Sequence, residues 1–266
     1  MSRYLRRRRA RGVRLALMLV ALLACAYAAG LMRAGLPGEV AAPTPSPERE
    51  TRSLTLDEYR FYAIQFGAFD NDADARELTN SLTARGAAGY VLTDTRSRAI
   101  GAAYTSREDA DKVCANLAAQ NIEAYVYEVA APRVELRVTA EPALLDAIEA
   151  ALPIAAQAID ELGAQALALD RADTSAEQVR AGLDAIAQPA RAALTRLETQ
   201  LGGRTHALTS GLISELHAVC DACDALAQQS VESAMDFSGK IKYNVIDLMH
   251  RHVQFMDLLI QPAASA

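Results

Sequence analysis

The chain has 266 residues, and 51% of them are hydrophobic, which is enough for one or two domains with apolar cores. Residues 1–33 hold eight of the 27 basic side chains and no acidic one, so the remainder carries 19 basic and 33 acidic side chains, a net charge of −14. This acidic remainder argues against a nucleic-acid partner, because nucleic acid requires a basic surface.

The N-terminus has the pattern of a membrane anchor. Residues 1–14 are a basic segment with seven arginines, and residues 15–32 are an uncharged apolar run of 18 residues, just long enough to cross a bilayer as one helix. Basic segments stay on the cytoplasmic side. We therefore expect a single-pass membrane protein, with its N-terminus in the cytoplasm and its bulk outside.

Two processing routes compete with this uncleaved span. Ala24, Cys25 and Ala26 form a small-residue pattern that suits cleavage of a signal peptide. Leu22–Cys25 also resembles a lipoprotein box, in which Cys25 would be acylated. All three alternatives place residues 34 onward outside the cytoplasm.

Residues 33–57 are predicted to be a linker, because four prolines and several charges in this stretch cannot bury a core. Fully extended at about 3.1 Å per residue, it would hold the next domain about 70 Å from the membrane.

Residues 59–129 contain an internal repeat of one unit, with an offset of 35 residues and no gap. The matching pairs are Phe69 with Tyr104, Ala75 with Ala110, Leu78 with Val113, Leu82 with Leu117, Tyr90 with Tyr125 and Val91 with Val126. Each copy has a strand, a helix and a second strand. One position differs in character: Gln65 of the first copy falls on Ile100 of the second.

The alternation and helical spacing in these copies predict an α+β domain over residues 58–130. The expected elements are strands at about 60–67, 89–93, 98–104 and 122–129, with helices after Asp72 and Ser106. Two such halves fold most simply as a ferredoxin-like split βαβ domain, a four-stranded antiparallel sheet with both helices on one face. The first and third strands should be central, and the other face should be open to solvent or ligand.

Three motifs in this stretch resemble the SPOR domain: YAIQFGAF (Tyr62–Phe69), YTSREDA (Tyr104–Ala110) and AYV (Ala124–Val126). The resemblance covers about 75 of the 266 residues. It implies a peptidoglycan-binding module that prefers glycan strands stripped of their stem peptides and is often concentrated at bacterial division sites. Known members are commonly carried on one N-terminal span with a linker.

The resemblance makes Gln65 the characteristic polar residue of the open sheet face, and Arg98 the basic residue that opens the third strand. A primary amide has two donors and two acceptors, which suits the hydroxyl, acetamido and lactyl groups of a glycan. The predicted glycan-binding residues are Gln65, Ala63, Gly67, Arg98, Ile100, Tyr125 and Tyr127. Ala63 and Gly67 would form a low floor beside Gln65, whereas the two tyrosines fit a core or a groove equally well.

The C-terminal part is predicted to be helical over residues 141–266, after a connecting segment at 131–140 that has the alternation of a short strand. Pro153 should kink or divide the first helix, and Thr174 with Glu177 forms a capping box for a later one. Such Ala-rich apolar stripes suit either an antiparallel bundle or a self-associating coiled coil.

His217, Cys220 and Cys223 share one helical face in this part. A metal site, a redox pair and plain core cysteines all fit this spacing, and the last is the simplest interpretation. The sequence has no phosphate-binding glycine loop, nucleophile motif or zinc motif, so we expect no enzyme activity, no cofactor and no metal.

The sequence therefore predicts a membrane-anchored envelope protein that binds peptidoglycan glycan strands in cell division or sporulation. Its helices would self-associate or recruit proteins of those processes. The alternative is a scaffold in which the duplicated domain and the helices both bind other proteins.

Overall fold

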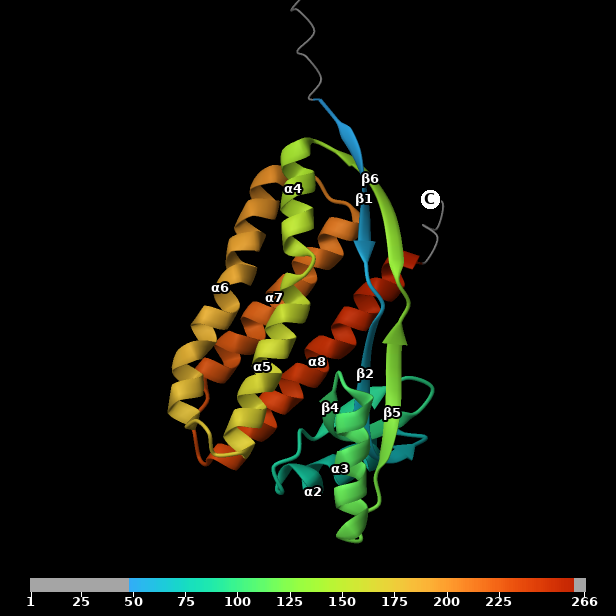
Figure 1. Cartoon of the computed structure of the whole chain (residues 1–266), viewed down its shortest axis with the longest axis vertical. Coiled ribbons are helices and arrows are strands. Elements are labelled where there is room, and N and C mark those ends of the chain that lie inside the picture. Colours follow the sequence, from blue (N-terminus) through green and yellow to red (C-terminus); the bar gives the residue numbers. More distant parts are fainter. Residues whose placement is uncertain (1–47, 261–266) are drawn as a thin grey trace, which may run out of the picture. The chain divides into compact units, whose positions relative to one another are not determined.

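The structure, a computed structural model, describes residues 48–260 (Figure 1). The predicted basic segment, the membrane span and most of the linker lie outside these residues. The elements in chain order are β1 (Glu50–Leu56), β2 (Tyr59–Phe69), α2 (Asp72–Thr83), β3 (Tyr90–Thr93), β4 (Ser97–Tyr104), α3 (Arg107–Ala119), β5 (Tyr125–Ala131), β6 (Val134–Ala140), α4 (Pro142–Ala151), α5 (Ile154–Asp170), α6 (Ala176–Leu201), α7 (Ala207–Gln228) and α8 (Ala234–Ile260).

The duplicated stretch forms the predicted four-stranded sheet. Its strand order is β3-β4-β2-β5, and every neighbouring pair is antiparallel, so the first strands of the two copies are central as expected. Asn71 and Ser106 cap α2 and α3. The two helices cover one face of the sheet, where Tyr62 and Ile64 pack with Ala110 of α3.

A second, two-stranded sheet extends this one and corrects the predicted linker. Residues 50–56, expected to be extended spacer, form β1 and pair antiparallel with β6. β1 continues into β2 and β5 continues into β6, so the two ladders lie end to end (Figure 1), with Leu56 opposite Val134 and Tyr59 opposite Ala131. Pro132 lies at the break, where its missing N–H cannot continue the ladder.

Helices α4 to α8 pack on one another within the chain, with α6 beside α7 and α5 beside α8. Their apolar stripes are thus buried in a bundle. Pro153 divides α4 from α5 as predicted, whereas Pro189 lies inside an uninterrupted α6. The capping box of α6 lies one residue later than predicted, and consists of Ser175 with Gln178.

Helix α8 gives the largest departure from the predicted fold, because it crosses the sheet face that was expected to be open (Figure 1). Phe61, Ala63 and Ile100 on that face belong to the same apolar core as the helical bundle. The ring of Tyr90 packs edge-on against Tyr243 of α8, with centroids 5.2 Å apart. The sequence could not reveal this cover, because the apolar face of α8 also suits helix–helix packing alone.

The stretch from Pro142 to Asp170, which contains α4 and α5, is long and apolar enough to cross a membrane by length and composition. Most of its large apolar residues, such as Ile148, Ile159 and Leu162, are buried in the bundle, whereas Leu167 is exposed. The core of the bundle therefore accounts for this apolar character.

Candidate functional site

The predicted site residues converge where β2 changes register. The pairing of β2 with β4 shifts on both sides of Gln65, which lies opposite Ile100 on β4 and opposite Tyr125 on β5. Gly101 occupies the irregular position of β4, and a side chain there would collide with the ring of Phe66. A bulge of this kind bends a strand and redirects its side chains, and Gln65 is only part-buried whereas Ala63, two residues earlier, is fully buried.

Gln65 is held by Arg98 on the neighbouring strand. Arg98 Nη1 donates to Gln65 Oε1 over 2.8 Å, and Arg98 Nε donates to Asp94 Oδ2 over 3.0 Å. The Arg98 guanidinium carbon lies 3.9 Å from the centre of the Tyr127 ring, and the Tyr127 hydroxyl donates to the same Asp94 oxygen. We call these four residues the Gln65 cluster.

The Asp94 carboxylate supplies the negative charge that balances Arg98 within the cluster. Burial raises the pKa of its carboxyl, but hydrogen bonds from Tyr127, from Arg98 and from the Arg96 backbone outweigh burial and hold the pKa well below its usual value. The carboxylate therefore stays charged and balances Arg98, whose side chain is only 14% exposed. The sequence analysis did not select Asp94. Its position in a hairpin turn, four residues before Arg98, is the feature of the sequence that could have indicated this pairing.

The Arg98 contact decides which groups Gln65 offers to a ligand. Arg98 has donors only, so Gln65 must turn its oxygen toward Arg98 and its NH₂ group away. Within residues 48–260, no protein atom accepts a hydrogen bond from that NH₂ group. The site therefore presents oriented donors, which suit carbonyl, carboxylate and hydroxyl oxygens.

The two tyrosines of β5, left open by the sequence, have different environments. Tyr127 has its ring under the Arg98 guanidinium and its hydroxyl on Asp94, so it belongs to the cluster. Tyr125 stands opposite Gln65 and is 57% exposed. An exposed aromatic face beside a polar amide is suited to stacking on an apolar face of a sugar ring.

Three other predicted site residues are corrected. Ala63 and Ile100 are both 0% exposed, because α8 and the bundle core cover them, and neither has a surface for a ligand to touch. Gly67 does not form a floor beside Gln65. A Cβ at Gly67 would point at Phe69 and at Leu78 of α2, because the bulge reverses the alternation of faces after Gln65.

The cysteines of α7 lie in the bundle core. Cys220 and Cys223 are buried free thiols, and burial raises the pKa of Cys223 to about 12. A thiol with so high a pKa carries almost no thiolate, which weighs against the redox interpretation. Among residues 48–260, no group of three or more His, Cys, Asp or Glu side chains is placed to hold a metal ion.

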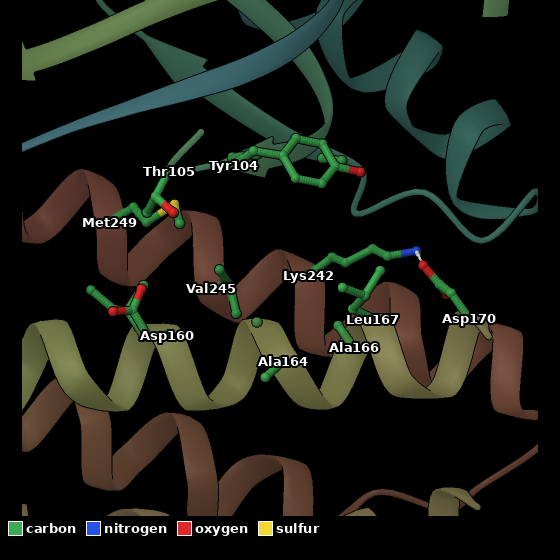
Figure 2. Close-up of a pocket in the computed structure, with 14 residues that line it drawn as sticks. Tyr104, Thr105, Asp160, Ala164, Ala166, Leu167, Asp170, Lys242, Val245 and Met249 are labelled. Carbon is green, nitrogen blue, oxygen red and sulfur yellow. Dashed lines mark hydrogen bonds and ion pairs between the residues drawn. The ribbon is translucent and has the colours of Figure 1, made fainter. Parts of the chain in front are cut away.

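A separate cavity of about 200 Å³ lies between the end of β4 and helices α5 and α8. Figure 2 shows Tyr104 and Thr105 on one side, Asp160 toward one end, and Lys242 pointing at Asp170 toward the other. Most of the remaining lining is apolar, and the volume is below the range of about 300–1,000 Å³ typical of ligand pockets. We therefore take the Gln65 cluster, and not this cavity, as the candidate site.

The comparison with protein families agrees with the motifs and the fold. Residues 58–128 match the SPOR domain. The match confirms the family that the motifs resemble, and it spans β2 to most of β5 together with the whole Gln65 cluster. Comparisons with curated proteins and with solved structures found no match to the chain. SPOR domains are peptidoglycan-binding domains associated with cell division, and the match supports this much for residues 58–128.

Helix α8 lies outside the matched segment, so the cover over the SPOR sheet comes from another part of the chain. Tyr90 on β3 contacts this cover: its hydroxyl lies 3.3 Å from Asp247 Oδ1 and 3.2 Å from His250 Nδ1. The Gln65 cluster of the SPOR domain therefore lies next to α8 and not on a fully open sheet.

Proposed function

We propose that the protein binds denuded peptidoglycan glycan strands in the bacterial cell envelope through the Gln65 cluster of its SPOR domain. The observation that carries the proposal is the contact of Arg98 with Gln65, which turns the NH₂ group of this part-exposed amide away from Arg98 and leaves it free to donate. The acetamido and lactyl groups of a glycan supply the oxygen acceptors for these donors. The exposed Tyr125 ring opposite Gln65 adds a stacking surface.

The proposal is tested by co-sedimentation of the full-length chain, kept in mild detergent, with amidase-treated sacculi. The chain should pellet with these sacculi, and Gln65→Ala should weaken binding about threefold to tenfold, the cost of one net hydrogen bond. A full-length chain that does not pellet would overturn the proposal. An excised SPOR fragment is unsuitable, because removing α8 would expose Phe61 and Ile100.

We further propose that residues 15–32 anchor the chain in the membrane with its N-terminus in the cytoplasm, and that the protein acts at the division septum. The apolar run and the basic segment before it support this topology. A periplasm-dependent reporter fused after Ala266 should be active, whereas activity restricted to a cytoplasm-dependent reporter would contradict the topology. The proposed role is binding, without catalysis.

A second candidate function is a scaffold that docks a protein, or another copy of this chain, on the end of α8. Leu258 is 63% exposed and Ile260 is 46% exposed, and both lie in the last turn of that helix. Leu258→Asp distinguishes the two functions. It should abolish septal localisation if docking by α8 recruits the protein, and leave it unchanged if glycan binding does.

A further inference from the structure

Helix α8 meets the sheet with two different sides. On the first side, Lys242, Val245 and Met249 line the cavity with Ala102–Thr105, at the far end of β4 (Figure 2). Asp247 and His250 instead contact Tyr90. A helix turns 100° per residue, so Gln254, one turn after His250, lies on this second side.

This side of α8 is close to the Gln65 cluster. Tyr90 lies opposite Ile100, and Ile100 lies opposite Gln65, so the three side chains form one row across the sheet. The Asp94 carboxylate is near enough to His250 to raise its pKa, although burial lowers that pKa more strongly. His250 therefore contacts this row through Tyr90, and the exposed Gln254 follows it by one helical turn.

A chain of hydrogen bonds fixes how Gln254 is turned. The Tyr90 hydroxyl has one hydrogen, which it donates to the Asp247 carboxylate, so His250 Nδ1 must carry a proton and donate to Tyr90. In neutral His250 the other nitrogen, Nε2, is then an acceptor. Gln254 Nε2 lies 3.2 Å from it and donates to it, which leaves Gln254 Oε1 free to accept.

We propose that Gln254 of α8 is a second glycan-contacting amide, and that His250 is the residue that positions it. The inference rests on the proposed function and extends the site beyond the SPOR domain. Gln65 offers donors and Gln254 offers an acceptor, and an N-acetylated glycan has both the carbonyl oxygens and the N–H groups that these two amides can bond. An N-acetylated glycan is therefore preferred over the same strand after de-N-acetylation.

The experiment measures binding of the full-length chain to amidase-treated sacculi at pH 7.5. Gln254→Ala should weaken binding about threefold to tenfold, the range expected for one hydrogen bond. Gln188→Ala, at an exposed glutamine of α6, is the matched control and should have no effect. His250→Phe keeps a ring but removes the acceptor, so it should weaken binding as Gln254→Ala does, and the double variant should be no weaker than either single variant.

The pH profile separates positioning from a general structural role. His250 faces Asp247 and Arg251 on its own helix, and Asp94 and Tyr90 on the sheet. Protonation converts Nε2 into a donor and turns the Gln254 amide around. Because burial lowers the pKa of His250, wild-type binding should weaken only at a pH below the ordinary histidine value of about 6.5, and this step should be absent in Gln254→Ala.

The outcomes distinguish the two proposals. If wild type binds, Gln65→Ala weakens binding and Gln254→Ala does not, the inference is overturned and the proposed function stands. If wild type does not bind at all, the proposed function fails first. If de-N-acetylated sacculi bind as tightly as untreated sacculi, the acetamido assignment is wrong.

Discussion

Arg98 donates to the side-chain oxygen of Gln65 across two adjacent strands, over 2.8 Å. This bond turns an amide that could point either way into an oriented pair of donors. The arginine itself is held by Asp94 and lies on the ring of Tyr127. A residue that orients another in this way matters for binding even if it never touches the ligand.

The first prediction is that Arg98→Ala weakens glycan binding about tenfold or more, because Gln65 loses its orientation and the ligand loses a nearby cation. Arg98→Lys should not restore binding, since an ammonium group cannot bond Gln65 and Asp94 together while stacking on Tyr127. The measurement is sacculus binding by the full-length chain. Arg96→Ala is the control, because exposed Arg96 pairs with Asp70 outside the cluster. Full binding by Arg98→Lys would contradict the proposed geometry.

The second prediction separates the two tyrosines of β5. Tyr125→Phe should bind normally, because the ring is retained and its hydroxyl bonds to Glu123 and not to the Gln65 cluster. Tyr125→Ala should weaken binding about threefold to tenfold by removing the stacking surface. Tyr127→Phe should also weaken binding, since Asp94 loses a donor. Equal behaviour of Tyr125→Phe and Tyr127→Phe would contradict these separate roles.

The third prediction concerns acid stability. Because the folded pKa of Asp94 is lowered, the folded state favours its charged form, and this contribution to the free energy of unfolding is present above about pH 3.9. It is lost as pH falls through the lower folded pKa. Asp94→Asn should reduce stability by about 1–2 kcal/mol at pH 6, since an amide accepts weaker hydrogen bonds. Urea unfolding at pH 6 and pH 3 measures both values, and the difference between wild type and variant should shrink at pH 3.

The sequence was sufficient to predict the SPOR sheet. In both copies the apolar residues alternate along the strands and recur at helical spacing along the helices, and these patterns follow from the local geometry of the backbone. The sequence analysis selected Gln65 because one copy has a polar residue where the other has Ile100, and it selected Arg98 because the SPOR resemblance implies a basic residue at the start of the third strand. It could not place Gly67, because a bulge changes the faces of a strand without changing the residue pattern. It also could not show that α8 covers Ala63. The two are more than a hundred residues apart in the sequence, and the pairing of such distant apolar faces depends on how the whole chain packs.

The last prediction tests this cover directly. Phe61 on β2 is fully buried in the core that the sheet shares with the helical bundle. Phe61→Ala should therefore lower the free energy of unfolding by about 3–5 kcal/mol, the usual cost of such a cavity. If the cover is intact in solution, the sheet and the helices should unfold together. Far-UV circular dichroism and hydrogen exchange at Ile64 on β2 should then report one transition with one midpoint in wild type, and one lower midpoint in the variant. An exchange midpoint that drops while the helical signal stays unchanged would show that α8 does not pack on the sheet.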